Sequence, residues 1–218
     1  GGTTITTCGF QYATNSALTS PTSASTSGTF GVAIYNQSLT TLTENTLYYY
    51  RGYAVNNCSS PQTDYSHTSS FPTFTTLHNA LNIGSGSGAT STSIVANWTA
   101  PTGGGSAAYT YEIQVDDDSA FGSVNYTQNA IASGTLTTTA TGLSFSTTYY
   151  YRVRAVNAGG NSAWSSTSVG YATLALPPEI NVTGNGNSIP DGTTATSVTN
   201  HTDFGSVTTT AGTIVRTF

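Results

Sequence analysis

Residues able to do chemistry are few in this chain of 218 residues, and most are scattered. The acidic cluster is Asp116, Asp117 and Asp118, and a Ca²⁺ ion needs several oxygen ligands that converge from one loop. Successive residues of a strand point to opposite faces, so three adjacent aspartates do not easily bind one ion. Two interpretations of Asp116 and Asp118 remain, a weak calcium site and a solvated turn, and the sequence favours the turn.

The histidines, His67, His78 and His201, lie far apart in the sequence. His201, Asp203 and Ser206 have the residue types of a catalytic triad, but they fall within one short turn-rich run, and a triad requires converging geometry. No glycine-rich phosphate loop precedes a helix, and no stretch has a convincing helical pattern. We therefore expect a protein that is not an enzyme and that uses no cofactor.

The clearest structural pattern lies in residues 148–157, where apolar and aromatic residues alternate with others at a period of two. Tyr149, Tyr151, Val153 and Ala155 fall on one face of this stretch. Alternation of this kind predicts a half-buried β-strand whose apolar face points to a core.

The same pattern occurs a second time at a fixed offset. Tyr149 follows Tyr48 by 101 residues, and Leu143 follows Leu42 by 101 residues. A repeat near 100 residues is the size of a β-sandwich domain. A leucine, a short turn and a tyrosine entering a strand also predict a tyrosine corner, in which the hydroxyl bonds to upstream backbone. The sequence thus predicts an all-β fold of tandem immunoglobulin-like sandwiches.

The repeated pattern Leu-x-x-x-x-x-Tyr-x-Tyr-Arg-x-x-Ala-x-Asn resembles strand F of a fibronectin type III domain. Trp98 resembles the core tryptophan on strand B of that family. The resemblance implies a complete domain at residues 79–174 and a partial one at residues 1–78, without strand A and most of strand B. It places Trp98, Tyr48 and Tyr149 in structural cores.

The resemblance also assigns the other strands. In the partial domain we expect strands C, E, F and G at residues 9–13, 29–35, 47–56 and 71–77. Phe30, Val32 and Ile34 would share one face of strand E. In the complete domain we expect strands A, B, C, E and G at residues 81–83, 94–98, 109–115, 136–143 and 162–173. On the outer faces of strands C and F, Glu112 should meet Arg152 or Arg154.

The two cysteines, Cys8 and Cys58, then fall at one pole of the partial domain. Cys8 opens the expected strand C and Cys58 follows the expected strand F. A disulfide between them would suit a secreted protein, and the alternative is two independent thiols. Two cysteines without a nearby histidine are too few for a zinc site.

The end of the chain has a different character. Residues 175–178 predict a stiff linker. Residues 179–218 resemble the start of a bacterial choice-of-anchor D module, which is immunoglobulin-like, through Pro-Glu-Ile, Gly-Asn-Gly, Asp-Gly, Thr-Asp-Phe-Gly-x-Val and Val-Arg-Thr-Phe. Such modules occur in large secreted bacterial surface proteins, often those exported by a type IX system, so the resemblance implies an extracellular location on the bacterial cell surface.

Two explanations fit incomplete first and last modules. Neighbouring residues of a longer chain would complete both, or strands of residues 179–218 would complete residues 1–78 of the next copy. The second arrangement is head-to-tail and would build a filament. We favour the first explanation.

The amino-acid composition limits the classes of binding partner. Only 6% of residues are charged, against ~25% in an average soluble protein, and the net charge is −5. No basic patch exists to bind the phosphates of a nucleic acid, so we expect no such partner. No run approaches the ~18 apolar residues that span a bilayer. We expect neighbouring domains or copies of the same protein as partners, with glycans as a further candidate.

Exposed aromatic residues can stack on sugar rings. Trp164 is the best candidate and Tyr53 the next, with Tyr65 and Tyr150 as further ones. The alternative for Trp164 is packing at the edge of its domain. Ser119, in Asp118-Ser119-Ala120, resembles an acceptor for bacterial O-glycans. The predicted function is structural and adhesive, as modules of an extracellular bacterial stalk or filament. The alternative is a carbohydrate-binding accessory region of a secreted enzyme.

Overall fold

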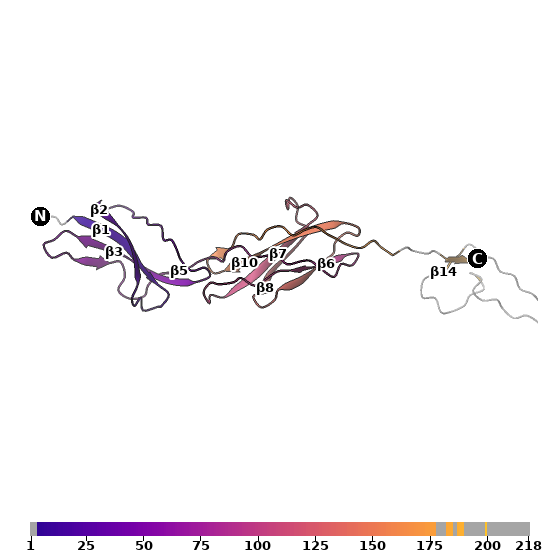
Figure 1. The fold of residues 1–218 in the computed structure, drawn as a ribbon, viewed down its shortest axis with the longest axis horizontal. Helices are drawn as coiled ribbons and strands as arrows, with labels where there is room; N and C mark the ends of the chain where they lie inside the picture. Colours follow the sequence, from indigo (N-terminus) through magenta and orange to yellow (C-terminus); the bar gives the residue numbers. More distant parts are fainter. Residues whose placement is uncertain (1–3, 178–181, 185–186, 190–198, 200–218) are drawn as a thin grey trace, which may run out of the picture. The chain divides into compact units, whose positions relative to one another are not determined.

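The chain is seen in a computed structural model that describes residues 4–177, 182–184, 187–189 and 199. Those residues form antiparallel β-sheets and no helix, which confirms the all-β prediction (Figure 1). The chain divides into two compact units, Gly1–Ala175 and Leu176–Phe218. Within the first unit we call residues 4–78 the first module and residues 79–174 the second module.

The second module has two sheets. The larger sheet has the strand order β11-β10-β7-β8, with β12 also paired to β10, and the smaller sheet pairs β6 with β9. The bounds are β6 (Ser93–Asn97), β7 (Tyr109–Asp116), β8 (Tyr126–Ala132), β9 (Thr137–Thr141), β10 (Thr148–Asn157), β11 (Gly160–Asn161) and β12 (Tyr171–Ala172). Expected strands B, C, E and F correspond to β6, β7, β9 and β10. Strand A is reduced to bridges such as Ile83 with Trp98, and β8 was not expected.

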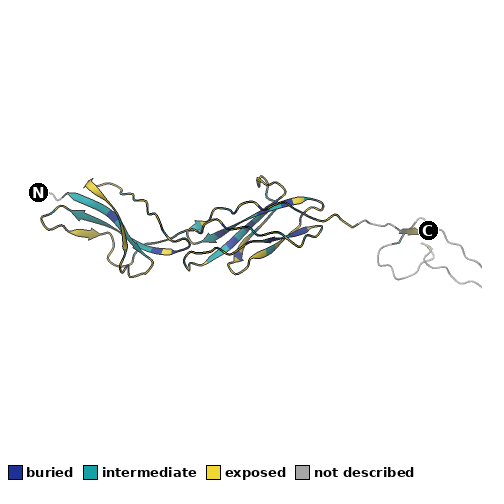
Figure 2. Ribbon diagram, viewed as in Figure 1, coloured by how far each residue is buried: buried dark blue, intermediate teal, exposed yellow. Residues whose placement is uncertain are grey.

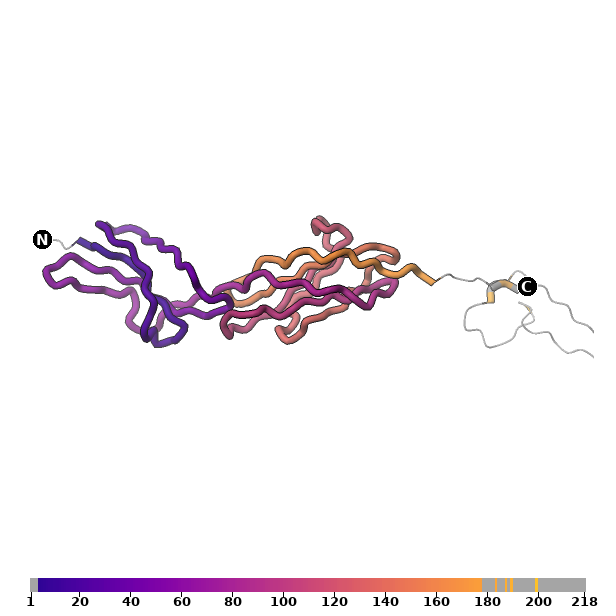
Figure 3. Tube along the Cα trace, viewed as in Figure 1, coloured from indigo at the N-terminus to yellow at the C-terminus, as the bar shows by residue number. Residues whose placement is uncertain are grey.

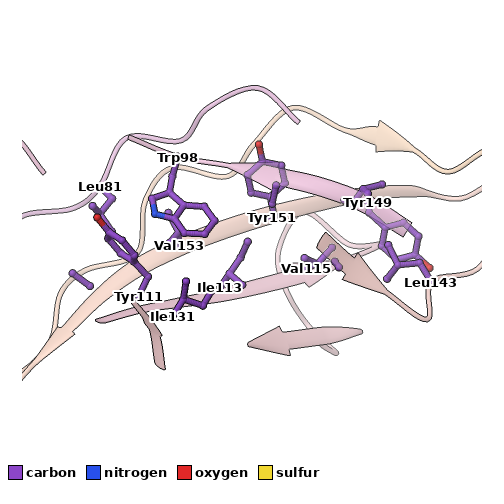
Figure 4. Close-up of a cluster of buried hydrophobic side chains, with 14 residues drawn as sticks. Leu81, Trp98, Tyr111, Ile113, Val115, Ile131, Leu143, Tyr149, Tyr151 and Val153 are labelled. Carbon is purple, nitrogen blue, oxygen red and sulfur yellow. The ribbon is translucent and has the colours of Figure 1, made fainter. Parts of the chain in front are cut away.

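The core of the second module lies between these sheets (Figure 4). Trp98 is 3% exposed and Tyr149 is 2% exposed, as predicted. Alternation explains the rest of the core, since successive strand residues point to opposite faces. The other fully buried apolar positions on β6, β7 and β10 are Ile94, Ala96, Tyr111, Ile113, Val115, Tyr151, Val153 and Ala155.

Both predicted tyrosine corners are present. The hydroxyl of Tyr149 accepts a hydrogen bond from the backbone N–H of Ser144 at 2.9 Å. The hydroxyl of Tyr48 accepts one from the N–H of Thr43 at 3.0 Å. Each bond ties the turn before a long strand to the first tyrosine of that strand, and this fixes the direction in which the strand enters the sheet.

A serine ladder replaces most of the strand expected at residues 162–173. Ser162, Ser165 and Ser168 are buried and recur every third residue, which matches the three residues per turn of a polyproline II segment. Their hydroxyls accept hydrogen bonds at 2.9 to 3.0 Å from the backbone N–H groups of Ala155, Val153 and Tyr151. Their own N–H groups donate to the carbonyls of the same residues. The edge of β10 is thereby satisfied without a continuous partner strand.

The first module repeats the larger sheet. Its strand order is β2-β1-β3-β4, with β5 also paired to β3, and this matches β8-β7-β10-β11 with β12. The bounds are β1 (Ile5–Ala13), β2 (Thr22–Phe30), β3 (Leu47–Asn56), β4 (Thr63–Tyr65) and β5 (Thr73–Thr75). Strand F at residues 47–56 is confirmed to the residue. Strand C is longer than expected. The strand expected at residues 71–77 is reduced to β5, and β4 was not expected.

The strand expected at residues 29–35 is wrong. Only Thr29 and Phe30 belong to β2, while Val32 and Ile34 are 111% and 90% exposed. Phe30 pairs with Ile5, where β1 begins, so residues beyond Phe30 find no partner on β1. Among the described residues no neighbouring strand supplies ladder hydrogen bonds beyond Phe30, so the alternating pattern does not produce a strand there.

Burial differs between the two repeats (Figure 2). Residues of β10 alternate between buried and half-buried, whereas β3 is half-buried over most of its length. Within residues 4–78 the structure describes no second sheet. The aromatic face of β1 and β3 instead meets residues before β3, where Tyr35 stacks on Phe10 with ring centroids 5.8 Å apart.

The predicted disulfide between Cys8 and Cys58 is wrong, because both cysteines are free. The register of β1 and β3 gives the reason. Cys8 lies opposite Ala54, whereas Cys58 lies beyond the end of β3, next to Asn57, whose N–H donates to the carbonyl of Thr4. Cys8 therefore lies within the paired strands and Cys58 beyond their end, whereas a disulfide needs Cα atoms within about 7 Å of each other.

We expect Trp98→Ala to destabilise the second module by roughly 3–5 kcal/mol, because it removes a buried indole and leaves a cavity. Chemical denaturation followed by tyrosine fluorescence would measure the loss. Trp164→Ala removes the same side chain from a half-buried position and is the control, with a smaller expected loss. A midpoint for Trp98→Ala close to that of the unaltered protein would contradict this account of the core.

We expect two reactive thiols per chain when the unreduced protein is unfolded and titrated with a thiol reagent. Cys8→Ser and Cys58→Ser should each give one. A titre near zero in the unaltered protein would show that the β1–β3 register described above does not hold in solution.

Candidate functional site

A polar site lies at the joint where the two modules of the first unit meet, which residues 78–80 connect (Figure 3). The N–H of Gly105 donates to the carbonyl of Glu44 at 2.8 Å, and the N–H of Ala107 donates to the carbonyl of Asn45 at 3.3 Å. The side-chain amide of Asn45 donates back to the carbonyls of Gly105 at 3.1 Å and Ala107 at 2.8 Å. One turn of the first module is thus paired with one loop of the second.

Asn157, the last residue of β10, extends this pairing. Its side-chain amide donates to the side-chain oxygen of Asn45 at 3.0 Å and to the carbonyl of Thr76 at 2.8 Å. Asn45 is only 1% exposed, and buried polar groups are costly unless they are hydrogen-bonded. Its backbone has a φ of 46°, in the left-handed region that asparagine tolerates better than most residues. Asn45 is therefore suited to this position by both its backbone and its side chain.

Glycines in the second module allow the backbones of the two modules to approach each other closely. A Cβ atom on Gly105 would lie 2.8 Å from the carbonyl oxygen of Asn45, and one on Gly159 would collide with the carbonyl of Thr75. Gly104, with a φ of 92°, turns the loop that carries Gly105. These positions need glycine because any side chain would push the modules apart.

His78 is buried in the connection between the modules, with 2% of its side chain exposed. Its Nδ1 atom lies 4.0 Å from Oε2 of Glu44, and its ring meets the ring of Tyr109 edge-on at 4.4 Å between centroids. Neither ring nitrogen has a hydrogen-bond partner. Burial lowers the pKa of His78, and the carboxylate of Glu44 opposes that effect more weakly. The imidazole is therefore neutral at pH 7.

An open groove of about 700 Å³ lies beside the joint. Its lining residues are Thr14, Thr43, Thr46, Leu47, Tyr49, Thr75, Gly105, Ser106, Ala107, Ala108 and Ala158. The lining has no histidine, cysteine or carboxylate. The groove therefore lacks the side chains that would act as general base or bind a metal ion.

On the outer face of the second module, Trp164 packs against two arginines. The guanidinium carbons of Arg152 and Arg154 lie 4.6 Å and 4.3 Å from the indole centroid. Arg154 forms an ion pair with Glu112 at 2.7 Å, which confirms one of the two predicted partners. Arg152 instead donates to Gln114, and burial together with the charge of Arg154 lowers its pKa. Part of Trp164 remains exposed, so sugar stacking there stays a prediction.

The remaining predicted site residues occupy separate places. Asp116 is buried and accepts from the N–H of Ser123 at 3.3 Å, and Asp118 is exposed and accepts from the N–H of Ala120 at 2.9 Å. Both carboxylates therefore bind amides of their own loop. Among the described residues there is no group of three or more metal-ligating side chains. Ser119 is exposed, and its glycosylation stays a prediction.

Tyr53 is half-buried beside Tyr65, with ring centroids 6.3 Å apart, and its role as a sugar platform also stays a prediction. His201, Asp203 and Ser206 lie outside the described residues, as does most of the region compared with choice-of-anchor D modules. In the second unit the structure describes one hairpin, β13 (Val182–Gly184) with β14 (Asn187–Ile189). The described residues contain no helix long and apolar enough to cross a membrane.

Sequence reasoning missed the joint. Asn45, His78 and Asn157 were not predicted as site residues, because each is an ordinary polar residue at the end of a strand or turn. Two signals were available. Asn56 and Asn157 end the two copies of the repeated strand, and a run of three glycines precedes β7.

Comparison with known proteins finds a family match within the second module. Residues 83–171 match the fibronectin type III domain family. No curated protein matches the chain. Similar solved structures include the FN1–FN3 domains of chicken CNTN1, with 15% identity and a TM-score of 0.40, covering 78% of this chain and 56% of that one. The chain thus spans little more than half the length of that structure.

Two human fibronectin type III domains are also similar. The domain from KIAA0970 protein has 15% identity and a TM-score of 0.38, covering 55% of this chain and 87% of that one. The domain from fibronectin type III domain containing protein 3 has 24% identity and a TM-score of 0.37, covering 44% and 86%. Fibronectin type III domains are generally non-catalytic modules, and no catalytic family matches the chain.

We expect Asn45→Ala to weaken the joint by roughly 3 kcal/mol, because it leaves the carbonyls of Gly105 and Ala107 without their donor and removes one of the two acceptors of the Asn157 amide. Hydrogen exchange of the Gly105 and Ala107 amides, followed by NMR, should accelerate roughly a hundredfold. Ser146→Ala is the matched control, since Ser146 is the equivalent residue in the repeat and also has a left-handed backbone, with a φ of 50°. Unchanged exchange in Asn45→Ala would show that the amide does not hold the joint.

Proposed function

We propose that the chain supplies rigid structural and adhesive modules of an extracellular bacterial surface protein, as part of a stalk or filament. The observation that carries this proposal is the joint. Six hydrogen bonds link the turn at Glu44 and Asn45, together with Thr76, to Gly105, Ala107 and Asn157. Tandem modules that are fixed to one another at a buried joint hold whatever they connect at a set distance.

The chemistry of the joint supports a fixed rather than a hinged connection. Separating the modules would expose Asn45 and leave backbone groups to be solvated, and the glycine contacts permit little sliding. Interfaces between modules of one chain usually allow relative motion unless the contact is extensive. Here a specific polar network takes the place of a large apolar contact.

The bacterial and extracellular parts of the proposal rest on the resemblance of residues 179–218 to choice-of-anchor D modules. A surface composed mainly of hydroxyl and amide side chains, with 6% charged residues, suits a secreted stalk. Its partners would be the neighbouring domains of the same protein or further copies of it. We also propose that the first module is a partial fibronectin type III-like domain, because its strand order repeats that of the second.

A second candidate is a carbohydrate-binding accessory region of a secreted enzyme. Trp164 favours it, because the two arginines beneath the indole hold the ring in place while part of it remains exposed. A fixed aromatic ring is the platform that sugar stacking uses.

For the spacer function, we expect the two modules to tumble as one body in nitrogen-15 relaxation, with a single correlation time. Gly159→Val should give two shorter correlation times, because its side chain collides with the carbonyl of Thr75 and forces the modules apart. Gly134→Val is the control, since a Cβ there meets nothing within 4 Å. Independent tumbling of the modules in the unaltered protein would exclude the rigid spacer.

A glycan array separates the two candidate functions. As a spacer, the protein should show no saturable binding to sugars. Micromolar or tighter binding that is lost in Trp164→Ala and kept in Phe145→Ala would favour the second candidate. Phe145 is a suitable control because it is 52% exposed and stands outside the arginine stack.

A further inference from the structure

His78 occupies an unusual position for a titratable side chain. It lies in the short connection between the modules, it is buried, and both of its ring nitrogens lack a hydrogen-bond partner. An imidazole with two unused nitrogens is tolerable only while it is neutral, because a buried charge needs a partner. The joint is therefore built around the neutral form of this residue.

The titratable groups that face His78 come from each side of the joint. Glu44 approaches from the turn before β3, and Tyr109 approaches from the first residue of β7. The carboxylate of Glu44 is already engaged, since its Oε2 accepts a hydrogen bond from the N–H of Asn79 at 2.6 Å. Tyr109 meets the imidazole with its ring. A proton on His78 would thus gain an attraction to Glu44 at 4.0 Å but no hydrogen bond in the observed geometry.

We propose that the joint is released by acid, because protonation of His78 favours the separated modules, in which the imidazolium is hydrated. Parting the modules would remove the contact with Tyr109 and admit water to both ring nitrogens. The released bonds would be those between Glu44, Asn45 and the loop at Gly105. The proposal rests on the rigid joint proposed above and adds a condition under which its rigidity is lost.

The sign of the pH effect follows from the direction in which burial moves the pKa. Burial lowers the pKa of His78 below 6.5 in the closed joint, whereas water restores the ordinary value once the joint opens. The open form therefore binds the proton more tightly. The joint has its full stability above about pH 6.5 and loses stability as the pH falls from there toward the lowered pKa. For every pH unit by which the two pKa values differ, the ratio of open to closed joint changes about tenfold.

The test uses the full chain and the exchange protection of the Gly105 and Ala107 amides, corrected for intrinsic exchange. Between about pH 7.5 and about pH 5, both protection factors should fall, by about tenfold if the pKa of His78 differs by one between the closed and the open joint. The amide of Leu143, which donates to Thr92 within the second module, should keep its protection. His78→Phe cannot take up a proton and should abolish the dependence. Glu44→Gln removes the carboxylate that raises the pKa of His78 in the closed joint. This variant should therefore show a stronger dependence of protection on pH.

The outcomes separate the two proposals. Low protection of Gly105 and Ala107 at both pH values would overturn the rigid joint and, with it, the spacer function. High protection at both values would leave the spacer function standing and overturn the release by acid. If the protection of Gly105 and Ala107 falls equally in His78→Phe, another group causes the pH effect, and the proposed release by acid through His78 is overturned. If His78→Phe does not fold, the imidazole protons of the unaltered chain decide, since His78 must titrate at a lower pH when folded than when unfolded.

Discussion

The fold depends on β10, a ten-residue strand whose inner face, two edges and two ends each contact a different part of the structure. Its inner side chains lie between the two sheets of the second module, and its backbone pairs with β7 on one edge and with the serine ladder on the other. Its first tyrosine fixes the preceding turn, and its last residue, Asn157, bonds across the joint. The core, the paired edges of the sheet and the joint therefore all depend on the register of β10. A slip of β10 by one residue would disrupt all three.

The joint is a consequence of the tyrosine corner in the first module. The bond from the N–H of Thr43 to Tyr48 fixes the turn that contains Glu44, Asn45 and Thr46. That turn is the surface that the second module contacts. The tyrosine corner that orders β3 thus also positions the carbonyls of Glu44 and Asn45 and the side-chain amide of Asn45, which bind the second module. This arrangement explains how the chain obtains a firm connection from few residues.

The two modules show how far a repeated sequence carries a repeated structure. Arg51 bonds to Gln11 and lies 3.8 Å from the ring centroid of Tyr65, while Arg152 bonds to Gln114 and lies against Trp164. The outer faces of the two large sheets are therefore alike. Burial of the inner faces differs, because β6 and β9 cover that of the second module. Strand order follows the local pattern, whereas depth of burial depends on what covers the sheet.

The sequence by itself determined the all-β class, the strands at residues 47–56 and 148–157, the tyrosine corners and the pairing of Glu112 with one of two arginines, of which the structure selects Arg154. Each of these features depends on the alternation of residues along one strand or on residues that face each other in one strand pair. Local rules of this kind leave a clear pattern in the sequence. The tertiary structure decided the rest. Asn45 meets Asn157 across 112 positions of sequence, and Cys8 is kept from Cys58 by a register that their spacing does not reveal. Val32 and Ile34 have the alternation of a strand but are exposed, and among the described residues no strand pairs with them. These features depend on which distant segments come together, and the packing of whole modules decides that.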